Sequence, residues 1–318
     1  MAAVAVGMKR ILAVFAVLAV MSGAFAAQPK TMVYSVRGTD TLRADYYSVQ
    51  APSAPCVVFM FGGGFYSGSR ASSSYTDYFE FLNERGYGVF SIDYRLGLKA
   101  LDGMSEKPSL GRMVGLLTSS VDMAVTDLYD ATAFLLKHAD ELGVDADRIL
   151  VCGSSAGAIS VLTGQWGLAR GRAEGILPAG FDYAGVISFA GAIYTVQGAP
   201  RRYAPSCPVM LFHGSADSNV PYRKLALGKI GFYGPQYLVK RMNRTEAPYY
   251  WCDFQDADHK IAVSPMNSNR EQIAYFLENY VEKGARLQIT ENIRNLDLPA
   301  RKGKIGIMDY VRSNFGEQ

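Results

Sequence analysis

This chain has few histidines and cysteines that could bind a metal, and its net charge is small. Among 318 residues there are three histidines and four cysteines, and their spacing matches none of the patterns that hold zinc. The formal net charge is +3, and there is neither a basic stripe nor an acidic tail. We therefore expect no metal site, and nothing in the charge pattern favours a nucleic-acid partner.

Long apolar runs are also nearly absent. Residues 11–21 form one such run, preceded by Lys9 and Arg10 and followed by the small-residue motif Ala24-Phe25-Ala26. This order is typical of a secretory signal peptide, predicted over residues 1–26, so we expect a periplasmic or extracellular protein. A membrane anchor is the alternative, but the run is short for a bilayer. No later run is long enough for stable insertion into a membrane.

Cysteine is used sparingly, although export would permit disulfides. Cys56 and Cys152 lie in apolar, strand-like runs and are interpreted as small buried hydrophobic residues. Cys207 and Cys252 flank the last two predicted core strands and are the candidates for a disulfide. Spacing alone does not determine that pairing.

What the chain does contain is an alternation of strand-like runs and helical patterns. A hairpin is predicted first, from Thr31–Val36 to Leu42–Val49. Later strands are predicted at Cys56–Phe61, Gly88–Tyr94, Asp147–Val151, Tyr183–Phe189, Pro208–Phe212 and Tyr249–Phe254, and helices at Tyr75–Arg85, Val121–Leu142, from Ala156 onward and at Asn269–Glu282. This alternation predicts an α/β protein with about eight strands in a mostly parallel sheet and helices on both faces.

No repeat, linker or low-complexity tract divides the chain. Residues 27–318 are therefore expected to form one domain, with its core at about residues 41–282. Residues 97–120 have weak periodicity and are predicted to be a surface loop. The tail, residues 283–318, is polar and poor in core residues, and it is expected either to wrap the domain or to extend from it.

The most informative motif is Gly153-Ser154-Ser155-Ala156-Gly157, between a predicted strand and a predicted helix. A chain that reverses tightly there needs small neighbours, and Gly153 and Gly157 leave that room. The turn lifts Ser155 clear of the sheet, beside a helix N-terminus. Ser155 is the predicted nucleophile, and a glycine- and serine-rich turn without chemistry is the alternative.

A second glycine-rich segment, Gly62-Gly63-Gly64, comes directly after a predicted apolar strand. Glycines let backbone N–H groups approach an oxyanion closely, and fixed donors stabilise charge that arises only in the transition state. Gly62 and Gly63 are the predicted donors, joined by the N–H of Ala156. A flexible surface loop is the alternative interpretation.

A carboxylate that could orient a catalytic imidazole is predicted just past a late strand. Asp217 holds that place in the segment His213-Gly214-Ser215-Ala216-Asp217. Asp182 and Asp253 are less well placed. An ordinary Asx turn at Asp217 is the alternative.

The chain has only three histidines that could act as the general base. His138 lies in a predicted helix and His213 at a strand end, and both are interpreted as structural. His259 follows the last predicted strand in a loop, where a general base belongs, and it is the predicted base.

These residues together resemble the α/β-hydrolase superfamily, in which the order along the chain is also nucleophile, acid, histidine. They look most like bacterial carboxylesterases with a His-Gly-Gly-Gly-type oxyanion loop, over about residues 41–282. The resemblance implies the α/β-hydrolase fold and ester hydrolysis by Ser155, Asp217 and His259 without a cofactor. Ser91–Leu96 also resembles a strand-end segment of that group, which gives Asp93 and Arg95 structural roles.

Two positions depart from the pattern of that group. Phe61 stands where a histidine usually supports the glycine loop, so activity is expected to survive the change. Ser154 stands where the hormone-sensitive-lipase-like branch usually has aspartate, which leaves the subfamily open.

The substrate is inferred from what covers the site. Gly191–Cys207, where caps are often inserted in this fold, is too short for a large cap domain. An open site favours short-chain esters and could admit acetyl or feruloyl esters carried on polysaccharide. Gly64, Phe65 and Ser154, which adjoin the two motifs, are the candidates for substrate contacts.

Two other functions are considered. A serine peptidase of the prolyl-oligopeptidase type usually has an aromatic or Asn residue and two glycines after the nucleophile, unlike Ala156-Gly157-Ala158, and it needs a gating domain. A hydrolase-like binding protein without catalysis usually lacks one member of the triad, whereas all three are present here.

Overall fold

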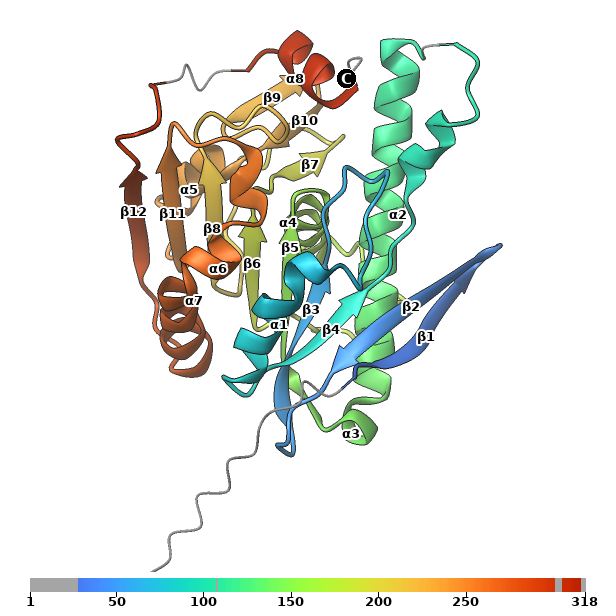
Figure 1. The fold of residues 1–318 in the computed structure, drawn as a ribbon, viewed down its shortest axis with the longest axis vertical. Coiled ribbons are helices and arrows are strands. Elements are labelled where there is room, and N and C mark those ends of the chain that lie inside the picture. Colours follow the sequence, from blue (N-terminus) through green and yellow to red (C-terminus); the bar gives the residue numbers. More distant parts are fainter. Residues whose placement is uncertain (1–27, 107, 301–304, 316–318) are drawn as a thin grey trace, which may run out of the picture.

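The computed structural model describes residues 28–106, 108–300 and 305–315, and the predicted signal peptide lies outside these residues (Figure 1). Nine strands form one sheet in the order β1-β2-β4-β3-β5-β6-β8-β11-β12. Only the β1–β2 and β2–β4 pairs are antiparallel, and the other neighbours are parallel. Their bounds are β1 Lys30–Arg37, β2 Asp40–Tyr47, β3 Ala54–Met60, β4 Gly88–Ile92, β5 Val144–Ser154, β6 Gly185–Phe189, β8 Val209–Gly214, β11 Tyr249–Gln255 and β12 Gln288–Arg294. The predicted α/β architecture is confirmed.

Helices cover both faces of this sheet. In Figure 1, α1, α6 and α7 lie on one face, and α2, α4 and α5 lie on the other. Their bounds are α1 Thr76–Asn83, α2 Leu110–Lys137, α3 Ala139–Leu142, α4 Ala156–Leu168, α5 Pro235–Met242, α6 Pro265–Ser268, α7 Arg270–Phe276 and α8 Ile307–Phe315. Because β3 and β6 are buried along their whole length, their side chains form the core between the two helical layers.

Two segments are more ordered than their sequence suggested. Helix α2 begins at Leu110, with the Ser109 hydroxyl accepting a hydrogen bond from the Arg112 N–H, so the second half of the predicted loop 97–120 is helical. The polar tail contributes β12, which pairs in parallel with β11 at the sheet edge. Alternate side chains of β12 are exposed, and an edge strand of this kind carries little apolar signal.

A small antiparallel sheet was not predicted. It consists of β7 Ile193–Thr195, β9 Lys224–Leu227 and β10 Ile230–Tyr233, in the order β7-β10-β9. These strands follow the carboxyl ends of β6 and β8, so they lie at the end of the main sheet where Ser155 is also found.

The cysteines are all free thiols and all buried. Cys207 and Cys252, the candidates for a disulfide, are therefore not bonded to each other. Burial raises the pKa of each thiol well above its usual value, which keeps the thiols protonated and unreactive. Among the described helices, none is long and apolar enough to cross a membrane.

Candidate active site

Ser155 lies on a strained turn between β5 and α4. Its φ is +50° and its ψ is −113°, a conformation that a non-glycine residue rarely adopts. A Cβ atom on Gly153 would lie 2.4 Å from the carbonyl carbon of Gly157, and one on Gly157 would lie 2.1 Å from the oxygen of Met60. The turn therefore requires glycine at both flanking positions, as the motif predicted.

Three side chains from distant parts of the chain meet at this turn. The Ser155 hydroxyl lies 2.8 Å from Nε2 of His259, and Nδ1 of His259 lies 2.7 Å from Oδ2 of Asp217. His259 begins the 3-10 turn after β11, and Asp217 lies in the loop after β8. The structure thus brings all three predicted triad residues into one hydrogen-bonded row, with His259 in the middle.

Asp217 is buried and held by several donors. Its Oδ1 accepts hydrogen bonds from the N–H groups of Asn219 at 2.8 Å and Val220 at 2.9 Å. Burial by itself raises the pKa of this carboxyl, but the hydrogen bond from His259 and the neighbouring imidazole of His213 hold the pKa below its usual value. Asp217 is therefore an ionised acceptor, as required of a group that orients an imidazole and stabilises its charged form.

His213 is a second imidazole on the same carboxylate. Its side chain is fully buried, and its Nε2 lies 3.1 Å from the Val220 carbonyl and 3.4 Å from Oδ2 of Asp217. Because both neighbouring oxygens are acceptors, Nε2 carries the proton. Burial lowers the pKa of His213, which favours the neutral form. The spacing of four residues between His213 and Asp217 was the signal for this contact, which sequence reasoning took as merely structural.

One predicted oxyanion donor is already occupied. The N–H of Gly62 donates to the Tyr75 hydroxyl at 3.1 Å, so it does not point to a ligand. The prediction for Gly62 is therefore corrected: its role is steric, since a Cβ there would lie 3.3 Å from the Cβ of Ser155. Tyr75 was missed because it lies 13 residues after Gly62, without a motif of its own.

The next two glycines have free N–H groups. Among the described residues, the N–H groups of Gly63 and Gly64 have no hydrogen-bond acceptor, and neither does that of Ala156 at the start of α4. Gly63 has a φ of +131°, and a Cβ there would lie 2.0 Å from the oxygen of Ser67. These three groups are the donors that the loop and the helix N-terminus leave for an anionic oxygen.

Two predicted substrate contacts are buried in the protein instead. Phe65 is 2% exposed and has a φ of +60°, and its ring packs edge-on against Tyr94. Ser154 is 1% exposed, and its hydroxyl donates to the Ala262 carbonyl at 2.8 Å. Both predictions are corrected: Phe65 anchors the glycine loop, and Ser154 ties the turn at Ser155 to the segment after His259.

The segment after β4 supports the glycine loop. Phe61 stacks on Tyr94 with ring centroids 4.5 Å apart, and the Tyr94 hydroxyl donates to the Phe61 carbonyl at 2.9 Å. Asp93 accepts a hydrogen bond from Arg70 at 2.8 Å, and Arg95 pairs with the buried Asp127 at 2.7 Å. Asp93 and Arg95 thus have structural partners, and aromatic stacking supports the loop where related enzymes use histidine.

The other aspartates that were considered have partners away from Ser155. Both carboxylate oxygens of Asp253 accept from the Tyr222 hydroxyl, at 2.9 and 2.8 Å. Asp182 accepts from the Ser206 hydroxyl. Neither is part of the row formed by Asp217, His259 and Ser155.

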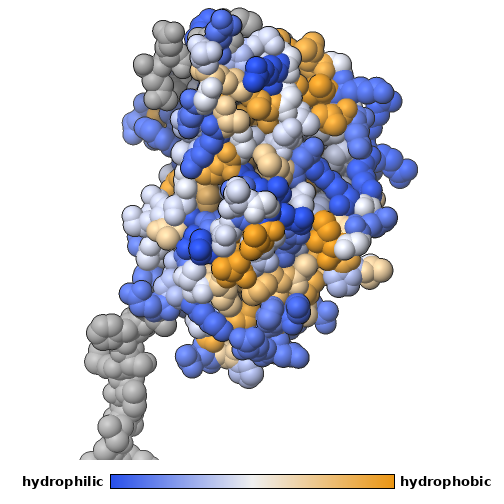
Figure 2. All heavy atoms as spheres, turned by 90° about the vertical axis from the view of Figure 1, so that its right-hand side faces the viewer, coloured by the Kyte–Doolittle hydropathy of each residue, from blue (hydrophilic) through white to orange (hydrophobic). Residues whose placement is uncertain are grey.

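An apolar groove of about 80 Å³ lies beside the small sheet. Its walls are the first two turns of α2, strands β9 and β10, and α8, and it includes Leu110, Leu227 and Tyr310. Figure 2 views the side of the molecule that α2 covers, and apolar surface is visible at its upper end among polar side chains. Of the elements around this groove, the first turns of α2 come from a segment that was interpreted as a loop, and α8 comes from the predicted tail.

The architecture is the α/β-hydrolase fold. Residues 33–164, less than half of the chain, match the model of the Carboxylesterase family. The native structure of an esterase from the planctomycete Thermogutta terrifontis aligns with 82% of this chain and 94% of its own, with a TM-score of 0.58 and 20% identity. The butyrate-bound form of that esterase aligns with 82% and 96%, with a TM-score of 0.57 and 21% identity.

A curated relative has a higher sequence identity, over a shorter stretch of the chain. It is named a probable N-octanoylanthranilate hydrolase, AqdA2, of Rhodococcus erythropolis, and it is 31% identical over 123 residues. The match covers 39% of this chain and 24% of that protein. This chain therefore matches only about a quarter of the length of that relative.

Proposed function

We propose that this protein is a serine carboxylesterase with Ser155 as its nucleophile. The observation that carries the proposal is the row from Asp217 through His259 to Ser155, with hydrogen-bond distances of 2.7 and 2.8 Å, at a strained strand-to-helix turn. A serine hydroxyl is a weak nucleophile unless an adjacent base takes its proton. Here Nε2 of His259 is in place to do so, and Asp217 fixes which ring nitrogen carries the proton.

The reaction proceeds in two acyl-transfer steps. In the first, His259 takes the proton from Ser155 as its oxygen attacks the ester carbonyl, and the proton then passes to the leaving alcohol. In the second, water attacks the acyl-enzyme with His259 again as base, releasing the acid and restoring Ser155. Asp217 stays ionised throughout and stabilises the imidazolium form of His259.

The oxyanion is held by backbone donors. We assign this role to the N–H groups of Gly63, Gly64 and Ala156, since the N–H of Gly62 is bound to Tyr75. Fixed donors stabilise the charge of the tetrahedral intermediate more than that of the ester, and each one contributes roughly 3 kcal/mol. The steric demands at Gly63 and Gly157 keep these donors in place without a flexible side chain.

The substrates proposed are short-chain esters. The connection from β6 to β8 carries only the three residues of β7 as regular structure, so no large insertion covers the site in the described chain. The Thermogutta esterase has been solved with butyrate and with propionate bound, both short acids. We further propose acetyl or feruloyl esters on polysaccharide as natural substrates, for an enzyme exported by the signal peptide at residues 1–26.

The test is hydrolysis of p-nitrophenyl acetate, butyrate and palmitate by the purified mature protein and by Ser155→Ala. We expect turnover of the two short esters and a loss of roughly 10⁴-fold or more in the variant. The neighbouring serine provides a control: Ser154→Ala removes a buried structural hydroxyl and should retain most of the activity. Equal turnover of palmitate would overturn the short-chain assignment, and activity that survives Ser155→Ala would overturn the nucleophile.

A further inference from the structure

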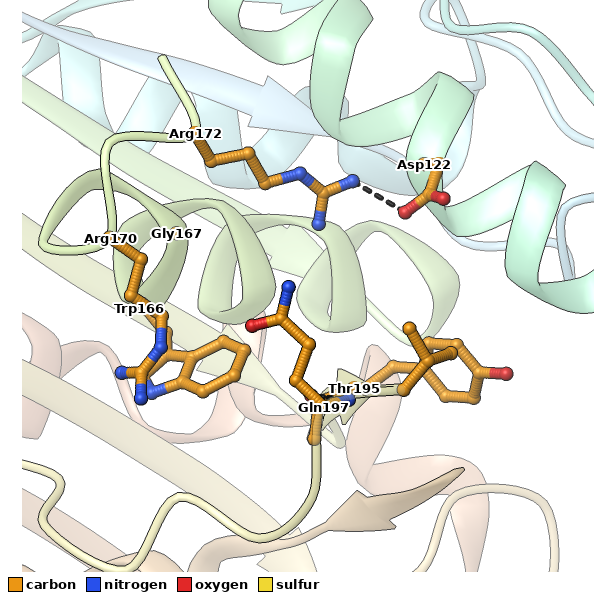
Figure 3. Close-up of a pocket in the computed structure, with 9 residues that line it drawn as sticks. Asp122, Trp166, Gly167, Arg170, Arg172, Thr195 and Gln197 are labelled. Atoms are coloured by element: carbon orange, nitrogen blue, oxygen red, sulfur yellow. Dashed lines mark hydrogen bonds and ion pairs between the residues drawn. The ribbon is translucent and has the colours of Figure 1, made fainter. Parts of the chain in front are cut away.

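A second cavity, of about 350 Å³, lies away from the triad. It is formed by Trp166 at the end of α4, by the arginines that follow that helix, by Asp122 of α2 and by residues 194–197 at the end of β7 (Figure 3). Ser155 precedes the opposite end of α4, and eleven residues of helix separate it from Trp166, roughly 16 Å along the axis. This cavity is thus a separate site and not an extension of the esterase site.

The cavity has an excess of positive charge. Arg172 and Asp122 form an ion pair at 2.5 Å, which occupies one nitrogen of that guanidinium. Arg170 lies flat over the Trp166 ring, with its guanidinium carbon 4.2 Å from the ring centroid, and it has no carboxylate partner among the described residues. Two guanidinium groups therefore face one carboxylate in the same cavity, and the charge of Arg170 is left for a ligand.

Hydrogen-bonding groups accompany this charge. Figure 3 shows the amide of Gln197 extending into the space between Arg170 and Arg172. Asp122 is half exposed, and only one of its oxygens is bound to Arg172. The Trp166 side chain is 7% exposed, so its ring forms a buried platform beneath Arg170. Such a platform holds the guanidinium in one orientation at the cavity wall.

We propose that this cavity binds a hydroxylated carboxylic acid of the size of an acidic sugar. A guanidinium over an aromatic ring keeps its edge free for a carboxylate, as that of Arg170 does, and Arg172 adds the nitrogens that Asp122 leaves free. Asp122 accepts from ligand hydroxyl groups, and the Gln197 amide can both accept and donate. A volume near 350 Å³ lies at the small end of ligand pockets and suits one or two sugar rings.

Two simpler ligands fit the cavity less well. A bare anion such as sulfate would use the arginines but has no hydroxyl group to donate to Asp122 or Gln197. A neutral sugar would use Asp122 and Gln197 but would leave Arg170 without its anion. The combination of two cations, one anion and an amide selects a ligand that has a carboxylate and hydroxyl groups together.

The site does not depend on the proposed esterase activity, and its test is a binding measurement on the full mature protein. Isothermal titration calorimetry with D-glucuronate should give a dissociation constant at or below about 1 mM. D-glucose should give no heat at the same concentration, and sulfate should bind at least tenfold more weakly. The intrinsic fluorescence of Trp166 should change on addition of glucuronate and should not change in Trp166→Phe.

Variants separate a binding role from a structural role. Arg170→Ala and Arg172→Ala should each weaken glucuronate binding about tenfold or more while keeping p-nitrophenyl acetate hydrolysis. The matched control is Arg241→Ala, which removes another arginine stacked on a ring, 4.0 Å from the Tyr237 centroid, outside the cavity. Ser155→Ala should bind glucuronate like the wild type, so failure of either proposal is seen separately.

The outcomes that would overturn the proposal are distinct. No heat and no fluorescence change with glucuronate up to about 10 mM would exclude the site. Equal binding of sulfate and glucuronate would reduce it to a general anion site. Unchanged binding in Arg170→Ala, with a lower melting temperature, would show that Arg170 only stabilises the end of α4. If a galacturonate trimer binds as well as monomeric galacturonate, the acid belongs to a polysaccharide. If the trimer does not bind, the ligand is the free acid.

Discussion

The two halves of the chain hold the proposed esterase site by different means. In the first half, backbone contacts leave no room for side chains: a Cβ on Gly63 or on Gly157 would lie about 2 Å from a carbonyl oxygen. In the second half, Asp217 and His259 lie on loops and are oriented by hydrogen bonds to their side chains. A position without room for a Cβ tolerates only glycine, whereas several residue types can supply a given hydrogen bond. This difference accords with a family match that covers residues 33–164 and not the rest.

The largest loss of activity is expected at His259, which belongs to the half that is held by hydrogen bonds. His259→Ala should lower kcat for p-nitrophenyl acetate by roughly 10⁴-fold or more, because Ser155 loses the base that takes its proton. His138→Ala is the matched control, since His138 contacts Phe134 and Glu141 at the end of α2, outside the site. Equal losses in the two variants would mean that the fold, and not the base, had been damaged.

Asp217→Asn tests the hydrogen-bonded half through its pH dependence. We expect a loss of about 10⁴-fold in kcat, because the amide no longer stabilises the imidazolium form of His259. The pKa of Asp217 is held below its usual value, so the charged form contributes stability above the unfolded-state pKa of about 3.9. That contribution is lost as the pH falls through the lower folded-state pKa.

Urea unfolding at a series of pH values measures this contribution. The free energy of unfolding of Asp217→Asn should lie below that of the wild type at pH 7, and the gap should narrow below about pH 4. A gap that stays constant from neutral to acid pH would contradict the assignment of Asp217 as a stabilising charge.

Gly157→Ala tests the backbone-held half. The new Cβ would lie 2.1 Å from the oxygen of Met60, and backbone cannot give way as a side chain can. We expect a destabilisation of about 3 kcal/mol and a roughly hundredfold loss of activity in whatever folds. Gly115→Ala, in an exposed and open position of α2, should be neutral or stabilise by up to about 1 kcal/mol. Thermal unfolding and p-nitrophenyl acetate assays distinguish the two, and similar melting temperatures would refute the steric argument.

The smallest loss of activity is expected at His213, a positioning residue that acts through Asp217. His213→Leu should lower kcat about fivefold to tenfold, since a hydrogen bond of this kind contributes about 1 kcal/mol. Asp217 would then have one donor fewer and would attract the charged form of His259 more strongly, so the acid limb of the kcat/KM profile should move to higher pH. Tyr129→Phe, which removes a buried hydroxyl that donates to Gly164, should leave that profile unmoved. An unmoved profile in His213→Leu would make its role purely one of packing.

The sequence predicted the parts of the site that have a local cause. Gly153 is required for a steric reason that acts within a few residues, because a Cβ there would meet the backbone of Gly157. The strand that precedes it carries the apolar run of a buried parallel sheet. With only three histidines in the chain, elimination was enough to select His259. The α/β class with a mostly parallel sheet follows from the regular alternation of strands and helices, and the resemblance of the motifs implied the α/β-hydrolase fold.

The tertiary structure alone decided what depends on distant partners. Whether Gly62 or Gly64 presents a free N–H depends on the Tyr75 hydroxyl, which no local pattern places beside the loop. Ser154 and Phe65 adjoin the motifs but face the protein interior, because Ala262 and Tyr94 meet them there. The strand β12 has no apolar run of its own and forms because β11 offers an open edge. Local sterics leave a mark in the sequence, whereas contacts between segments far apart along the chain are decided only when the sheet brings them together.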